Sequence, residues 1–211
     1  SSAIIDGSIG TSALATNAVV GSKIRDAAVG SSAIADDAVG TSALISIQTG
    51  VPHFWQEIGR TTLGAAGDTI TVSSLSSREH LWVITDLRAS GSIIPILRFN
   101  NDSGNNYARR YSIDGGADGT DVNQSAIGIG GAAARDFIHH YLVDNISTLE
   151  KTATMIRFHD IVAAGPGTAP QKIELVGKWS NTASAITRID VINTDTGSFN
   201  TDSEVIILGA D

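Results

Sequence analysis

The chain has 211 residues, of which 42% are apolar and 17% are charged, with a formal net charge of −8. That length suits one ordinary domain plus an appendage, and the acidic balance argues against nucleic-acid binding and against binding to anionic membrane surfaces. The absence of cysteine excludes disulfides and thiolate metal sites, and no apolar run reaches the roughly 18 residues of a membrane span.

Residues 1–50 carry a ten-residue repeat with the consensus Ser/Thr-Ser-Ala-Ile/Leu-x-Asp-x-Ala-Val-Gly. Within it, a large apolar residue recurs at every fifth position: Ile4, Ile9, Leu14, Val19, Ile24, Val29, Ile34, Val39 and Leu44. Because the repeat is already in phase at Ser1, we expect a longer parent chain with further residues before it.

The five-residue step does not suit a regular element. In an α-helix it leaves a rotation of about 140°, so the apolar stripe would wander round the helix. In a straight strand an odd step alternates faces. The pattern therefore predicts short extended pieces separated by corners, with the Asp-x and Gly-Ser/Thr steps supplying the turns.

A single copy of this segment is not expected to be stable alone. Ordering ten backbone residues costs roughly 10–20 kcal/mol, whereas burying two branched side chains returns about 3–6 kcal/mol. Partner chains must supply the rest, so we predict a homotrimeric shaft with the nine apolar positions packed around the axis. The alternatives are a flexible linker, a pentapeptide-type solenoid or a helical collar.

The segment Ser-Ala-Ile-Ala-Asp-Asp-Ala-Val-Gly-Thr-Ser-Ala-Leu, residues 32–44, resembles the repeats of bacteriophage tail-fibre and other appendage proteins. It departs from them at Asp37, and the preceding copy does so at Ala27, where the family often has Gly. The resemblance covers about a quarter of the chain. It implies a trimeric virion fibre whose N-terminal end is bound to other virion proteins.

Residues 51–211 are predicted to form one all-β domain, a β-sandwich with a jelly-roll-like arrangement. Turn residues separate many short strand-like runs, and no helix is required beyond a single turn at Ala132–Arg135. The expected strands are Trp55–Thr61, Thr69–Ser73, Leu81–Arg88, Ile93–Phe99, Tyr107–Ser112, Ser125–Gly128, Phe137–Asp144, Thr152–Ile161, Lys172–Trp179, Ile186–Ile192 and Glu204–Leu208.

Two stretches of this domain, Ile58-Gly-Arg-Thr-Thr-Leu63 and Leu97-Arg-Phe-Asn-Asn-Asp-Ser-Gly-Asn-Asn-Tyr107, resemble domains of phage virion proteins of unassigned role. This resemblance implies a structural or host-facing virion component. It carries over no catalytic residue.

No motif in the sequence indicates catalysis or a bound cofactor. A nucleophile elbow of the Gly-x-Ser-x-Gly type is missing, and the Gly128-Ile-Gly130-Gly131 run has no helix after it. His139 and His140 are neighbours, so a strand would point them to opposite faces. A metal centre joining His140 to His159 and Asp160 is the alternative to ordinary surface or interface histidines.

Asp114, Asp118 and Asp121 share one Gly-rich loop and are candidate Ca²⁺ ligands, although their spacing is not that of an EF-hand. A solvated turn is the alternative. The Asn, Asp and aromatic side chains also suit sugars, but Trp82 and Trp179 lie in apolar strand patterns and are expected in the core.

These features together predict a non-enzymatic structural protein of the virion. It would be a trimeric fibre presenting a β-sandwich head for attachment to a host glycan or protein, without nucleic acid and without membrane insertion. The alternatives are a capsid-decoration or head-fibre protein and a subunit of an extracellular filament. A glycan-degrading enzyme would require clustered carboxylates, which the sequence does not reveal.

Overall fold

The computed structural model describes residues 55–128, 136–159, 166–167 and 169–211. All of these belong to one compact unit, Pro52–Asp211. The repeat with its nine predicted packing positions lies outside the described residues, as does the helical turn expected at Ala132–Arg135. Strands and turns make up the described part, which contains no helix, and the all-β class is confirmed. None of its elements is a helix capable of crossing a membrane.

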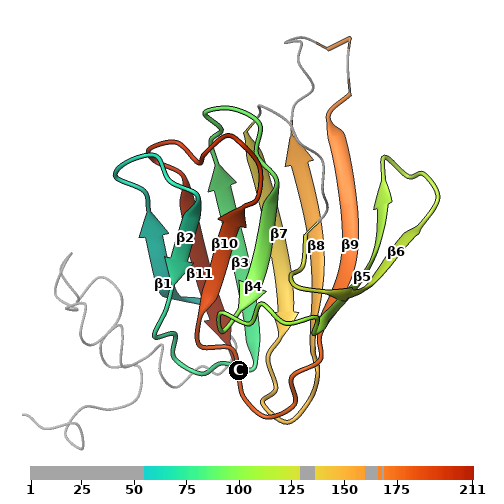
Figure 1. Cartoon of the computed structure of the whole chain (residues 1–211). Coiled ribbons are helices and arrows are strands. Elements are labelled where there is room, and N and C mark those ends of the chain that lie inside the picture. Colours follow the sequence, from blue (N-terminus) through green and yellow to red (C-terminus); the bar gives the residue numbers. More distant parts are fainter. Residues whose placement is uncertain (1–54, 129–135, 160–165, 168) are drawn as a thin grey trace, which may run out of the picture. The chain divides into compact units, whose positions relative to one another are not determined.

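Eight strands form one large antiparallel sheet, in the order β1-β11-β3-β7-β8-β9-β5-β6 (Figure 1). The strands of this sheet are β1 (Gln56–Thr62), β3 (His80–Leu87), β5 (Tyr107–Ile113), β6 (Gly119–Gln124), β7 (Phe137–Asp144), β8 (Lys151–His159), β9 (Gln171–Trp179) and β11 (Glu204–Ala210).

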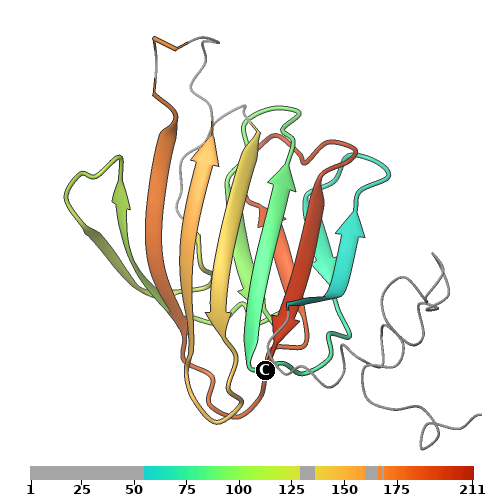
Figure 2. The ribbon, with the colours of Figure 1, turned by 180° about the vertical axis from the view of Figure 1, so that it is seen from behind.

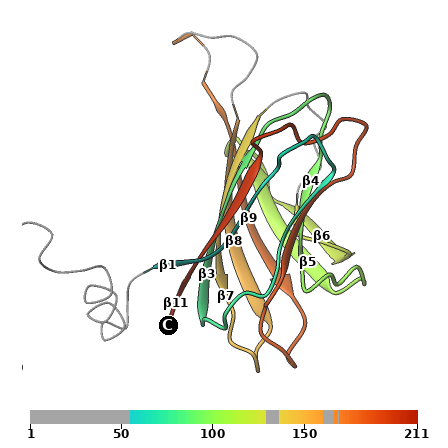
Figure 3. The same cartoon turned by 90° about the vertical axis from the view of Figure 1, so that its left-hand side faces the viewer.

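A smaller antiparallel sheet has the order β2-β10-β4 and comprises β2 (Thr69–Val72), β10 (Ile189–Asn193) and β4 (Pro95–Phe99). It forms a second layer against one face of the large sheet, as the edge-on view makes clear (Figure 3). Pro95 opens β4 at the edge of this sheet, a position where a missing N–H breaks no interior ladder. The two antiparallel layers are consistent with a β-sandwich.

Every second side chain of the central strands points into the space between the sheets, as the two-residue period of a strand requires. The buried side chains from the large sheet include Leu81, Val83, Leu87, Phe137, Tyr141, Val143, Met155, Leu175, Val205 and Ile207, and those from the small sheet include Ile70, Val72, Leu97, Phe99, Ile189 and Val191. We call the face of the large sheet that turns away from this core the outer face.

One expected strand is wrong. Residues 125–128 do not form a strand, and the chain instead pairs with β5 through β6, immediately before them. Ile127 makes only an isolated bridge, with two backbone hydrogen bonds to Leu97. Ile127 is fully buried, so the apolar signal that predicted a strand reflects burial and not ladder pairing.

A buried lysine locks the loops at one end of the large sheet. The Lys151 ammonium donates hydrogen bonds to the carbonyls of Ser147 (3.2 Å), Leu149 (2.7 Å) and Asn181 (2.9 Å). It also lies 5.8 Å from the centre of the Trp179 ring. Burial lowers the pKa of Lys151, and the three carbonyls satisfy its three donors.

The neighbouring Trp179 is itself held by a carboxylate. Its indole Nε1 donates to Asp102 Oδ2 at 2.7 Å, and the same carboxylate accepts from the Asn106 side chain and the Gly104 backbone N–H. Burial alone would raise the pKa of Asp102, but these three hydrogen bonds favour the charged form, and the net pKa lies below its usual range.

Candidate interaction surface on the outer face of the large sheet

Strands β3, β7 and β8 carry large apolar residues on both of their faces. An antiparallel sheet with one solvated face normally alternates apolar and polar residues. Strand β9 comes closer to this pattern, since Lys172, Glu174 and Lys178 point outward together with Val176. On β3 and β7, by contrast, residues such as Trp82 and Leu142 point to the outer face although the opposite face is already packed in the core.

The pairing register places these outward residues side by side. Across the strands, Leu208 faces Trp82, Trp82 faces Leu142, and one row further along Ile84 faces His140, which faces Ile156. We call the resulting patch the outer band. It consists of Trp55, Trp82, Ile84, Ile138, His140, Leu142, Ile156, Phe158, Val176, Ile206 and Leu208. Figure 2 views the sheet from this side, with β3, β7 and β8 at its centre.

A chain of rings runs through the outer band. Trp55 meets Trp82 edge-on with ring centres 6.0 Å apart, Trp82 lies 5.8 Å from His140, and His140 meets Phe158 edge-on at 6.2 Å. The Trp82 indole N–H donates to His140 Nδ1 at 3.2 Å. In neutral His140 the ring proton is therefore on Nε2, and the Trp82 N–H and His140 Nδ1 satisfy one another.

The outer band contains a shallow hollow of about 400 Å³, lined by Trp55, Trp82, His140, Leu142, Thr154 and Ile156. Six band side chains are 40–56% exposed. An aromatic side chain presents about 150–250 Å² and the aliphatic ones somewhat less, so these six leave on the order of 400 Å² of surface in contact with water. The largest apolar patch of a typical monomer is about 300–600 Å², and such patches commonly mark interaction sites.

Charged and polar residues border the outer band at both ends of the strands. Asp86 lies at one end, and at the other end His80 contacts Asp144 at 3.3 Å. On β9, Lys172 and Lys178 each contact an exposed glutamate, at 3.1 and 2.8 Å. An apolar, aromatic centre within a charged rim is the usual composition of a protein–protein interface.

The expected core position of Trp82 is wrong, whereas that of Trp179 is confirmed. Trp179 is 1% exposed, but Trp82 is half-buried on the outer face. The run Leu-Trp-Val-Ile from residue 81 is apolar at every position, so its pattern does not say which alternate set faces the core. The unbroken apolar run could itself have indicated the outer band, because a strand with one solvated face normally alternates apolar and polar residues.

The two neighbouring histidines lie on opposite faces, as predicted. His139 is buried on the inner face, where its Nδ1 lies 2.8 Å from Thr85 Oγ1. Its cross-strand neighbour Arg157 is also buried, its guanidinium lies 5.0 Å from the centre of the Phe137 ring, and burial lowers its pKa. A site joining His140 to residues 159 and 160 falls outside the described side chains.

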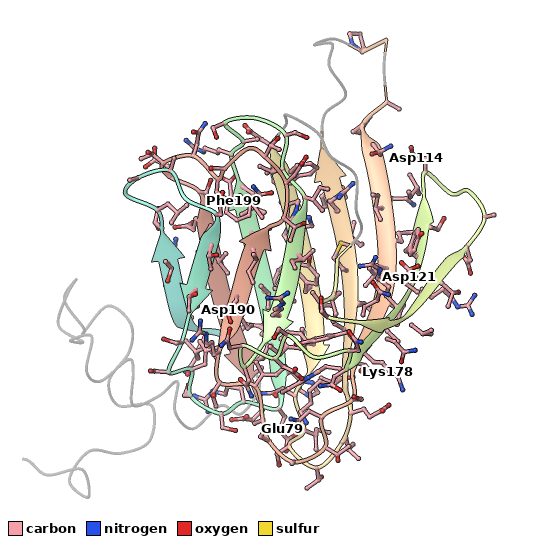
Figure 4. All side chains as sticks on the ribbon, viewed as in Figure 1. Glu79, Asp114, Asp121, Lys178, Asp190 and Phe199 are labelled. Carbon is pink, nitrogen blue, oxygen red and sulfur yellow. The ribbon has the colours of Figure 1, made fainter. Side chains whose placement is uncertain are left out.

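The three carboxylates proposed for Ca²⁺ are not brought together. Asp114 accepts hydrogen bonds from Gln171 and from the backbone of Lys172, and Asp121 is bound by Arg109 at 2.8 Å, well away from Asp114 in Figure 4. The carboxylate of Asp118 lies 3.5 Å from Arg110. Within the described ranges, no group of three or more His, Asp or Glu side chains is arranged to hold a metal.

Comparison with known proteins gives no match to a protein-family model, to a curated protein or to a solved structure.

Proposed function

We propose that this chain is a structural subunit of a trimeric virion fibre, in which residues 51–211 form a β-sandwich head for attachment to a host surface. Two independent features support the proposal. The ten-residue repeat resembles the shafts of phage fibres and requires other chains for its stability. The head carries an apolar outer band, which would be exposed to water in an isolated head.

The outer band is the observation that carries the proposal. An isolated soluble domain gains nothing from placing Trp82, Leu142 and Ile156 on a solvated face, because exposed apolar clusters favour aggregation. A subunit of an assembly needs such a face. A description of the head as jelly-roll-like stays a prediction, because the described strands divide eight and three, unlike the eight-stranded pattern of two Greek keys.

The mass of the full chain in native buffer tests the proposal. A trimer at micromolar protomer concentration is the expected result, and a clean monomer would contradict it. A trimer would still fit a capsid-decoration protein, a head fibre or a filament subunit. Electron microscopy of the parent particle with an antibody against the head separates these by location.

A glycan-degrading enzyme is the second class of function. It needs two carboxylates flanking a bound sugar. In the described residues, the carboxylates of Asp102, Asp121 and Asp190 are each engaged by hydrogen bonds or by an arginine. Incubation of the protein with host polysaccharide should leave the length of the polysaccharide unchanged. Shortened polysaccharide would favour the enzyme.

A further inference from the structure

We propose that the outer band is the surface through which three copies of the head pack against one another around a common axis. This inference rests on the trimer of the proposed function and adds which face of the head the copies share. The occupant of the band is therefore a second copy of this chain, and not a host receptor or a ligand.

The first step concerns where the chain enters the head. Trp55 is the first described residue, and it lies in the outer band with its ring against Trp82. The 54 residues before it in the sequence contain the ten-residue repeat. Copies joined through the repeat would thus be tethered at the border of the band. Such tethering raises the effective concentration of neighbouring bands to the millimolar range.

The second step separates another copy from the chain's own N-terminal segment as the occupant. The repeat has nine apolar positions spread over about 50 residues, whereas the band spans a few strands. One band could cover only a small part of that segment. The remaining apolar positions still need other chains, so the copies gather in either case, and their bands then come within reach of one another.

The third step is the chemistry of the band. A carbohydrate site would offer free hydrogen-bonding groups beside its aromatic rings. At the centre of the band the Trp82 N–H is already donated to His140, so the polar groups left beside the rings are His140 Nε2 and the Thr154 hydroxyl. The other central side chains, Ile84, Leu142 and Ile156, are apolar. Surface of this kind is stabilised by contact with another apolar surface.

The test compares two leucines of the full chain. Leu142 lies in the band and is 51% exposed, whereas Leu149 lies in the β7–β8 loop outside the band and is 55% exposed. Leu142→Lys should separate the heads, and Leu149→Lys should not. Trp55 and Trp82 report the separation, because their fluorescence becomes accessible to acrylamide, while Trp179 stays buried in the core.

Cross-linking identifies what covers the band. The chain has no cysteine, so Leu142→Cys introduces a single thiol. A short bismaleimide should join copies carrying Leu142→Cys into covalent dimers, and copies carrying Leu149→Cys should stay uncoupled. If neither variant is joined, the chain's own segment or nothing covers the band, and the inference is overturned.

The outcomes separate the inference from the proposed function. A monomeric wild-type chain defeats both. If the wild-type chain is a trimer, and the Leu142→Lys and Leu149→Lys variants have the same mass and the same acrylamide quenching, the inference alone is wrong. The trimer is then held together by the repeat. Support requires that Leu142→Lys either dissociates the trimer or exposes the band tryptophans, with Leu149→Lys matching the wild type and Leu142→Cys alone being cross-linked.

Discussion

Replacement of Lys151 by methionine is expected to destabilise the head strongly, although it removes a buried charge. Methionine matches the aliphatic part of lysine in length and volume, so the buried space stays filled, although the contact of the ammonium with the Trp179 ring is lost. What is lost is the donor group that satisfies the carbonyls of Ser147, Leu149 and Asn181. These carbonyls belong to two loops at the same end of the sheet, which the ammonium joins.

The magnitude follows from the three hydrogen bonds. A buried acceptor left without a partner costs about 1–3 kcal/mol, but these loops lie near the surface and water can reach part of the site. Removal of the buried charge returns some of the loss. We expect a net loss of about 2–4 kcal/mol in the free energy of unfolding, or a decrease of roughly 5–15 °C in Tm for a domain of this size.

The measurement is chemical denaturation of the full chain at a fixed protomer concentration, followed by tryptophan fluorescence, with Tm from a thermal scan. The matched control is Lys172→Met. Lys172 forms an exposed ion pair with Glu174, and such pairs contribute about 0–1 kcal/mol. If Lys151→Met is as stable as this control, the ammonium is dispensable and the reasoning about the loop lock is wrong.

Three further predictions concern the same domain. Gly197→Ala should lower the stability by about 1–3 kcal/mol in denaturant titrations, because an added Cβ would lie 2.6 Å from backbone atoms of Gly91 and Ser92, whereas Gly64→Ala meets nothing within 4 Å and should be neutral. Asp102→Asn should lower the free energy of unfolding by about 1–3 kcal/mol above pH 5. Because the pKa of this carboxyl is lower in the folded than in the unfolded chain, the stability difference between wild type and variant should disappear as the pH falls through the folded pKa. A stability difference that persists unchanged at about pH 2 would show that the charge is not its source. Addition of EDTA or Ca²⁺ should leave Tm unchanged, because the carboxylates of Asp114, Asp118 and Asp121 have separate partners. A rise of several degrees in Tm with Ca²⁺ would support the calcium site that the sequence suggested.

Much of the strand pattern could be predicted because it is local. Runs such as Lys172–Trp179 alternate except at Val176 and Gly177, and Gly, Asn and Asp mark the turns between the runs. Most strand positions therefore agree with the structure to within a few residues. The strand predicted at residues 125–128 was wrong, because Ile127 is an apolar residue that is buried without forming a strand. A short apolar run does not reveal whether its backbone will find a pairing partner.

The sequence by itself determined the all-β class of the head and the approximate position of its strands. Where a strand is apolar at successive positions, tertiary structure alone decided which face each side chain took. Leu81 and Trp82 are both apolar, and only the pairing of β3 with β7 and β11 assigns Leu81 to the core and Trp82 to the outer face. Strand order also brings Trp55, just before β1, together with residues from β3, β7, β8, β9 and β11 that are up to about 150 positions away in the sequence. The outer band is a product of this non-local pairing, which no local periodicity encodes.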